Sequence, residues 1–123
     1  MPRAQVRRFY SAVDVVLDTF PFSGGVTSLQ ALDAGVPVVT VRSGEWRGRL
    51  TAVMLEELGL KECCIAEDGD EYVRKARALA EDIDVGTVTK DRLLRALDET
   101  RKLFHKRETL REWAILVNRL LQW

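Results

Sequence analysis

The sequence predicts an α/β fold, a small parallel sheet followed by a helical tail. Short, apolar, β-branched runs alternate with segments of helical periodicity over about residues 1–86. From about residue 87 to residue 123 only helical periodicity remains. A strand, a turn, a helix and a second strand in succession make a βαβ unit, whose two strands lie parallel in one sheet.

The elements of the first half follow from local patterns. Val6, Phe9, Tyr10 and Val13 recur at helical spacing after Pro2 and predict an opening helix. The next elements are a strand at Val13–Leu17, a loop at Phe20–Gly25, a helix at Val26–Ala34 stopped by Gly35, and a strand at Val38–Val41. Pro37 is acceptable there because the first residue of a strand need not donate to the ladder.

The second half continues the alternation and then becomes helical. A helix at Leu50–Leu58 closes at Gly59, the "CCIA" stretch is a third short strand, and "DGDEYVRKARALAEDI" is a helix with Asp68 or Asp70 as N-cap. Two helices end the chain, at about Thr89–Phe104 and Glu108–Leu121. Three strands alone would expose apolar faces, so we expect another segment or another subunit to cover them.

Composition limits the function classes. The 123 residues allow one domain, 1–123, and their 46% apolar and 31% charged content is typical of a globular protein. Nineteen basic residues cancel nineteen acidic ones, which argues against nucleic acid and anionic membranes as partners. No apolar run approaches the roughly 20 residues of a membrane helix, and the start lacks a signal core. We therefore expect a cytoplasmic protein.

The cysteines and the histidine offer little chemistry. Cys63 and Cys64 are adjacent, which would strain a mutual disulfide, and no CxxC spacing offers a metal site, so we interpret them as reduced thiols. His105, the single histidine, lies in the basic stretch "RKLFHKR" at an expected helix end. A capping or solvated role for it is preferred to a catalytic one.

The stretch "FSGGVTS" lies between the expected first strand and the helix that follows it. Ligands of α/β sheets bind beyond the carboxyl ends of the strands, where a helix start offers unpaired N–H groups. Gly24 and Gly25 would permit φ > 0 and close approach of a phosphate, and Thr27 and Ser28 add hydroxyl groups. The pattern is neither GxGxxG nor a P-loop. The alternative is a glycine turn that only begins a helix.

The same residues carry a resemblance to a known family. "VDVVLDTFPFSGGVTSLQALDAGVPVVT", then "GRLTAVMLEELGL" and "DEYVRKARALAED", is similar to the carboxyl-terminal end of the O-linked N-acetylglucosamine transferase family, SPINDLY-like members included. The family is typified by an "LDTfPyNGgTTtcdaLwmGvPvvT" block, an "SR" helix and an "eeYv..A..la.D" helix. Order and spacing match from about Phe9 to the end of the chain, least specifically in the last two helices.

The resemblance implies a GT-B glycosyltransferase, in which two Rossmann-like domains face a cleft. This chain would be the carboxyl-terminal part of the nucleotide-sugar-binding domain, with a UDP-sugar as donor substrate, a protein acceptor and no metal cofactor. The acceptor domain and other upstream parts would precede residue 1, so the active site would be incomplete and no catalytic residue lies in this chain. The alternative is a non-catalytic remnant that self-associates, for example as a homodimer, through the face that the missing strands would cover.

The resemblance also implies a set of site residues. Segments matching Gly25, Val26 and Thr27 reach the diphosphate in the family, and the position of Gln30 contacts the ribose. The full nucleotide-sugar set is Ser23, Gly24, Gly25, Val26, Thr27, Ser28 and Gln30. The chain departs from the family at four positions, where Val26 replaces Thr, Gln30 replaces Asp, Asp33 replaces Trp and Ser23 replaces Asn. The departures at residues 26 and 30 predict weaker UDP binding, because a hydrogen bond to a charged group is worth about 1.5–3 kcal/mol.

Two further side chains are candidates near this loop. Arg49, which matches the Arg of the family's "SR", follows the second strand together with Arg42 and Arg47, so it could be a second anion contact or a structural residue. Asp18 belongs to the "LDT" of the family block, where loop fixation is preferred to acid/base work with Asp14.

Overall fold

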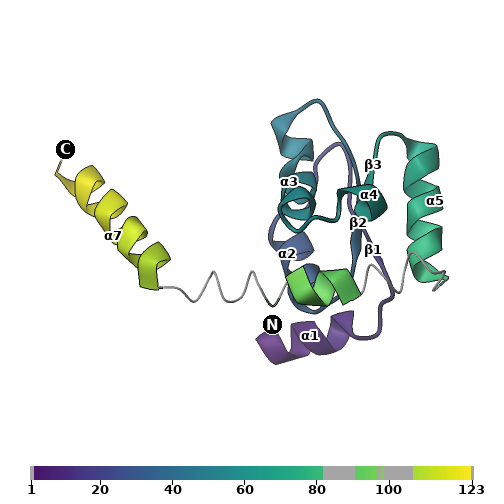
Figure 1. The fold of residues 1–123 in the computed structure, drawn as a ribbon, viewed down its shortest axis with the longest axis horizontal. Coiled ribbons are helices and arrows are strands. Elements are labelled where there is room, and N and C mark those ends of the chain that lie inside the picture. The colour runs from purple at the N-terminus through teal and green to yellow at the C-terminus, as the bar shows by residue number, and fades with distance from the viewer. Residues whose placement is uncertain (1, 82–90, 97, 99–106, 123) are drawn as a thin grey trace.

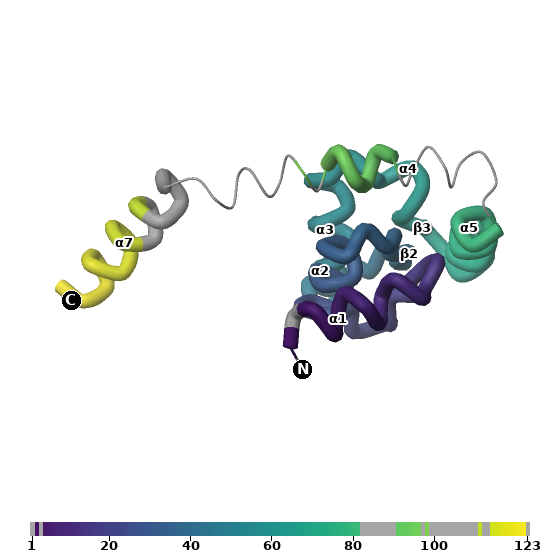
Figure 2. Tube along the Cα trace, turned by 90° about the horizontal axis from the view of Figure 1, so that it is seen from below, coloured from purple at the N-terminus to yellow at the C-terminus, as the bar shows by residue number. Residues whose placement is uncertain are grey.

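The computed structural model describes residues 2–81, 91–96, 98 and 107–122 and confirms the predicted α/β class (Figure 1). Three parallel strands form one sheet in the order β1 (Val16–Leu17), β2 (Val38–Val41), β3 (Ile65–Ala66). Helices α2 (Val26–Asp33) and α3 (Leu50–Glu57) cover one face, and α5 (Gly69–Ala80) covers the other (Figures 1 and 2).

Strand β2 is the centre of the sheet. Val16 of β1 stands opposite Val38, and Thr40 stands opposite Ile65 of β3. Because helices cover both faces, β2 is buried on both sides. The core around it consists of fully buried side chains, among them Leu32, Leu55, Leu60, Leu79, Leu93, Val38 and Val39.

Two strand predictions were too long. The first strand begins at Val16, not Val13, because the Val13 N–H donates to Tyr10 O at 3.0 Å and so closes the end of α1 (Arg3–Tyr10). In "CCIA" only the last two residues are strand. The cysteines belong to the short helix α4 (Lys61–Cys64), where the Cys64 N–H donates to Leu60 O at 3.1 Å.

Glycine follows the ends of α2 and α3, as predicted. Gly35 after α2 and Gly59 after α3 have φ of 80° and 70°, the left-handed conformation that glycine adopts without steric cost. A short 3₁₀ helix, η1 (Trp46–Gly48), lies between β2 and α3 and was not predicted.

Only parts of the predicted helical tail are described. Residues 91–96 are helical, and Leu93 from this turn is buried in the core. Helix α7 (Arg107–Leu121) stands apart from the α/β body in Figures 1 and 2, with Leu120 and Leu121 exposed. The rest of the predicted Thr89–Phe104 helix, His105 and the domain boundary near residue 86 lie outside the described residues. No helix of the described part is long and apolar enough to cross a membrane.

Helix α5 begins with a network of acidic side chains. Asp68, one of the two predicted N-caps, accepts from the Glu71 N–H at 2.8 Å. The Glu71 carboxylate accepts in turn from the Glu67 N–H at 2.8 Å and pairs with Lys75 at 3.0 Å. These contacts favour the ionised form, so the hydrogen bond from Glu67, followed by Lys75, lowers the pKa of Glu71.

Replacing Glu71 by Gln is expected to lower stability at neutral pH and to matter less in acid. A carboxyl group whose pKa is lowered on folding stabilises the native state above its ordinary pKa, 4.5 here, and loses that effect as the pH falls through its folded value. Urea unfolding of both proteins between neutral pH and pH about 3 should show the difference narrowing below pH 4.5. Glu57→Gln, at an exposed position of α3, is the matched control for the loss of a surface carboxylate.

Candidate functional site

The "FSGGVTS" loop lies at the carboxyl edge of the sheet, as predicted, between the end of β1 and the start of α2. Its backbone is fixed by Asp18, the residue that follows β1. Asp18 is 5% exposed, and its two carboxylate oxygens accept from the Gly24 N–H and the Thr40 hydroxyl, both at 2.7 Å. The predicted loop-fixing role of Asp18 is therefore confirmed.

A second set of hydrogen bonds fixes the other half of the loop. The Thr51 hydroxyl of α3 donates to Gly24 O at 2.9 Å, so it must accept from the Ser28 hydroxyl, which lies 2.8 Å away. The Ser23 N–H and hydroxyl both donate to Arg47 O at 3.0 Å. Ser23 and Ser28 are buried, and both hydroxyls bond within the chain. In this structure they build the loop and do not face solvent.

The start of α2 is left open. No side chain caps Gly25, the N-cap residue, and the N–H groups of Gly25, Val26 and Thr27 have no hydrogen-bond partner within the described residues. Val26 is 70% exposed and the Thr27 side chain is exposed beside it. Unpaired N–H groups and the helix dipole together attract an anion.

The two glycines differ in their roles, and neither has the predicted positive φ. Among the described residues only Gly35 and Gly59 have it. At Gly24 the reason for glycine is space, because a Cβ would lie 2.7 Å from Ser28 Oγ and 3.2 Å from Asp18 Oδ1. At Gly25 a Cβ would meet only Leu50 Cδ1, at 4.0 Å. Glycine at that position leaves the helix start uncovered.

Besides Val26, two departures from the family block lie on α2. Gln30 is exposed and stands one turn after Val26, on the same side of the helix. Asp33 forms an ion pair with Arg7 of α1 at 3.5 Å, so it helps to hold the first helix against α2. Gln30 therefore remains available to a ligand, whereas Asp33 has a structural contact.

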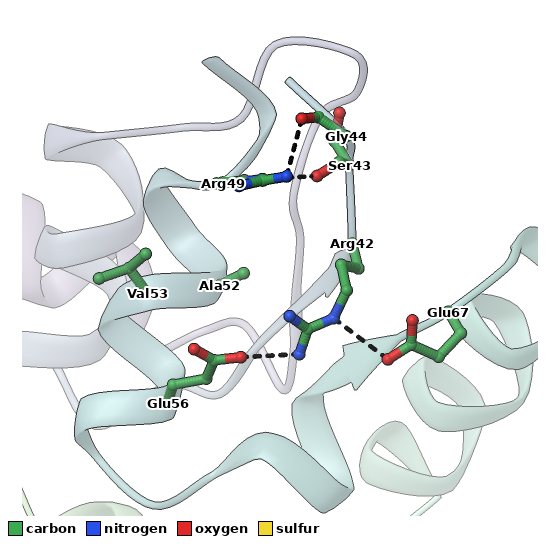
Figure 3. A pocket seen from close by; sticks show the side chains of 8 residues that line it. All are labelled: Arg42, Ser43, Gly44, Arg49, Ala52, Val53, Glu56 and Glu67. Atoms are coloured by element: carbon green, nitrogen blue, oxygen red, sulfur yellow. Dashed lines mark hydrogen bonds and ion pairs between the residues drawn. The ribbon is translucent and has the colours of Figure 1, made fainter. Parts of the chain in front are cut away.

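A pocket of about 480 Å³ opens beyond the ends of β2 and β3 (Figure 3). Arg42 forms its centre and pairs with Glu56 at 2.7 Å and with Glu67 at 3.2 Å. Arg49 donates to Ser43 O at 2.9 Å and to Gly44 O at 2.8 Å (Figure 3). Arg49 thus holds the loop after β2. The loop "FSGGVTS", called the glycine loop below, does not line this pocket.

Sequence reasoning missed the partners that frame the site. Tyr72 of α5 donates its hydroxyl to Asp18 O at 2.8 Å, and its ring packs edge-on against Phe20. Burial, with a smaller contribution from Asp18, raises the pKa of Tyr72, so the donor form is kept. Sequence analysis also missed Thr51, which lies in the largely apolar helix α3. The feature that could have identified it is a hydroxyl side chain at a buried position of that helix.

The fold and the site together define a class. A parallel sheet with helices on both faces and an uncapped helix start at its carboxyl edge is the arrangement of Rossmann-like domains. The family model described as Glycosyl transferase family 41 matches residues 3–112. The chain belongs to glycosyl transferase family 41.

Individual proteins agree with this assignment. The chain is 39% identical over 74 residues to a probable UDP-N-acetylglucosamine–peptide N-acetylglucosaminyltransferase SPINDLY of Solanum lycopersicum, covering 60% of this chain and 8% of that protein. It is 36% identical over 93 residues to the SPINDLY protein of Hordeum vulgare, covering 76% and 9% respectively. A mutant O-GlcNAc transferase of Thermobaculum terrenum matches in structure with a TM-score of 0.74 and 38% identity, covering 80% of this chain and 19% of that one. The chain thus spans a small part of its relatives' length.

Proposed function

We propose that this chain is the diphosphate-binding part of the UDP-sugar site of a protein glycosyltransferase. The observation that carries the proposal is the uncapped start of α2, where three N–H groups have no hydrogen-bond partner within the described residues, at the carboxyl edge of the sheet. The relatives' names add the donor and acceptor classes, UDP-N-acetylglucosamine and a peptide. The donor we propose is a UDP-hexose or UDP-N-acetylhexosamine, and the acceptor is a Ser or Thr hydroxyl of a cytoplasmic protein.

The proposed role of the loop is electrostatic. When the glycosidic bond to the donor phosphate breaks, negative charge grows on the departing diphosphate. The N–H groups of residues 25–27 are fixed in place before the reaction, so they stabilise that charge without reorganisation. We propose that this happens without a metal ion. The group that deprotonates the acceptor would belong to an amino-terminal GT-B domain.

Exposed aromatic side chains support such a partner domain. Phe20 is 64% exposed, Phe22 60% and Trp46 69%. The loop that carries Phe22 and the helix η1 that carries Trp46 are joined by the hydrogen bonds between Ser23 and Arg47. Apolar surface beside a binding loop favours closure by a second protein surface. We propose that the acceptor domain covers these side chains and encloses the donor.

Titration with UDP, followed by the amide signals of isotope-labelled protein, tests the proposal. Saturable shifts confined to Gly24–Ser28, with none on adding uridine, would support diphosphate binding at the start of α2. Gly25→Val, which places a side chain over the N–H groups, should remove the shifts. Equal shifts with uridine, or no shift at millimolar UDP, would reject the proposed site.

Val26→Thr is expected to tighten UDP binding by about tenfold, since it restores a hydroxyl donor to a charged acceptor. Val26 is 70% exposed, so the hydroxyl enters without a clash. The matched control is Val73→Thr, at a 63% exposed position of α5, which should leave the dissociation constant unchanged. Equal affinities of the Val26→Thr and wild-type proteins would argue against a diphosphate at this helix start.

One observation favours the non-catalytic alternative. The N–H groups of Val16 and Asp18 donate to Pro37 O and Val39 O, so the Leu17 N–H faces the outer edge of β1, where the described residues provide no partner. The Leu17 side chain is 55% exposed. A second copy could pair along this edge. A concentration-dependent dimer that is lost in Leu17→Lys, together with no UDP binding, would establish this function instead.

A further inference from the structure

Cys63 and Cys64 form a pair of reduced thiols where α4 turns into β3. Their sulfur atoms lie 3.4 Å apart, and the Cys64 thiol donates to Cys63 Sγ. The Cys63 thiol donates to Leu60 O at 3.4 Å. Cys63 is half-buried and Cys64 is fully buried, so a reagent arriving from solvent meets Cys63 first.

The Cys64 thiol is held in its protonated form. The hydrogen bond to Cys63, together with burial, raises the pKa of Cys64 well above its ordinary value. Cys64 therefore keeps its proton and points it at the neighbouring sulfur. A thiolate at Cys63 would accept that hydrogen bond, so Cys63 is the nucleophile of the pair.

The separation of the sulfurs suits a bridging atom better than a direct bond. A disulfide needs sulfurs about 2.05 Å apart and Cα atoms at least about 4.4 Å apart, whereas adjacent Cα atoms are about 3.8 Å apart. One atom bound to both sulfurs at about 2.3 Å, a usual soft metal–thiolate length, would span the observed 3.4 Å at an angle of about 95°. Such an angle is typical of a pyramidal, three-coordinate centre.

The number of protein ligands narrows the choice further. Zinc in structural sites takes four protein ligands. Among the residues that the structure describes, no group of three or more His, Cys, Asp or Glu side chains could hold a metal ion. A monosubstituted trivalent arsenical brings its own carbon ligand and needs only two thiolates.

We propose that Cys63 and Cys64 form a chelating site for monosubstituted trivalent arsenicals. In the reaction R–As=O + 2 Cys–SH → R–As(S–Cys)₂ + H₂O, two As–S bonds form and the As=O bond breaks. The oxygen leaves as water with both thiol protons, and arsenic keeps its oxidation state. Cys63 attacks first, and Cys64 closes the chelate from the buried side.

The site is linked to the rest of the fold through β3. Ile65 O accepts from Lys75 Nζ at 2.6 Å, and Ala66 O accepts from the Arg42 N–H at 2.8 Å. Occupation of the thiols should therefore shift the amide signals of residues 65 and 66. Signals of the glycine loop should stay in place, which distinguishes this site from the proposed diphosphate site.

The test uses the full chain and phenylarsine oxide. The wild-type protein should form a one-to-one adduct that survives excess monothiol and is released by dimercaptopropanol. Cys63→Ala and Cys64→Ser should each lose the adduct under monothiol, with retention at least tenfold lower. Because Cys64 is buried, Cys63→Ala is the decisive variant, and circular dichroism checks the fold of both.

Thermal unfolding distinguishes binding to the folded protein from reaction with the unfolded chain. A ligand of the native state raises Tm, so phenylarsine oxide should raise the Tm of the wild type and leave that of Cys63→Ala unchanged. A lowered Tm of the wild type would overturn the proposal, since binding would then favour the unfolded chain. A monothiol-resistant adduct on Cys63→Ala would also overturn it.

Discussion

Replacing Asp18 by Ala is expected to lower the free energy of unfolding by about 3–5 kcal/mol, since hydrogen bonds to charged groups are worth about 1.5–3 kcal/mol each. The substitution removes the acceptor of both the Gly24 N–H and the Thr40 hydroxyl, at a site that is 5% exposed. The Gly24 N–H then has no acceptor in the interior, whereas the Thr40 hydroxyl can turn. Urea unfolding measures the change.

Two variants separate the effect of the contacts from that of the charge. Asp18→Asn should cost less, because its amide oxygen can accept from Gly24 and its NH₂ can donate to the Thr40 hydroxyl, which then turns to accept. Asp14→Ala, at an exposed position before β1, should change stability by at most about 0.5 kcal/mol. Asp18→Ala and Asp14→Ala of equal stability would show that the carboxylate does not hold the loop.

Replacing Gly24 by Ala is expected to disrupt the loop and to weaken UDP binding more than tenfold. The new methyl group would meet Ser28 Oγ at 2.7 Å, and this hydroxyl cannot retreat because it is buried against Thr51. Overpacking of this kind costs about 1–3 kcal/mol. Urea unfolding would give the loss of stability, and titration with UDP would give the loss of affinity.

The matched control is Gly44→Ala, in the loop after β2. A Cβ at Gly44 meets nothing within 4 Å, so both stability and UDP affinity should stay at the wild-type values. If Gly24→Ala binds UDP as tightly as Gly44→Ala does, the shape of the glycine loop does not determine binding.

The sequence was sufficient to predict the fold class and the order of the main helices and strands, but not η1 or α4. β-Branched runs and helical spacing are local properties of the sequence. Gly35 and Gly59 were recognised as helix ends because glycine readily adopts the positive φ that a helix end requires, and both residues have it. The ends of the strands were predicted less well. Whether Val13 or Cys64 belongs to a helix end or to a strand depends on a single hydrogen bond, to Tyr10 O and Leu60 O respectively, and hydrophobicity does not encode that choice.

The position of the loop before α2 was predicted, whereas the contacts that shape it were predicted only in part. Its place at the carboxyl edge follows from the βαβ unit. The burial of Ser23 and Ser28 depends on Arg47 and Thr51, which are distant in sequence. The assumption of positive φ at Gly24 failed for a related reason. The need for glycine there comes from Ser28 and Asp18 as neighbours in space, and a single sequence does not reveal such neighbours.

The bonds around Asp18 have a consequence for the order of folding. Asp18 joins Thr40 across 22 positions and Tyr72 across 54, and Gly24 joins Thr51 across 27. Each closure costs chain entropy that grows with the logarithm of the loop length. A chain emerging from the ribosome can therefore form α2 early, whereas the loop before α2 takes its final shape only once residue 72 has joined the fold.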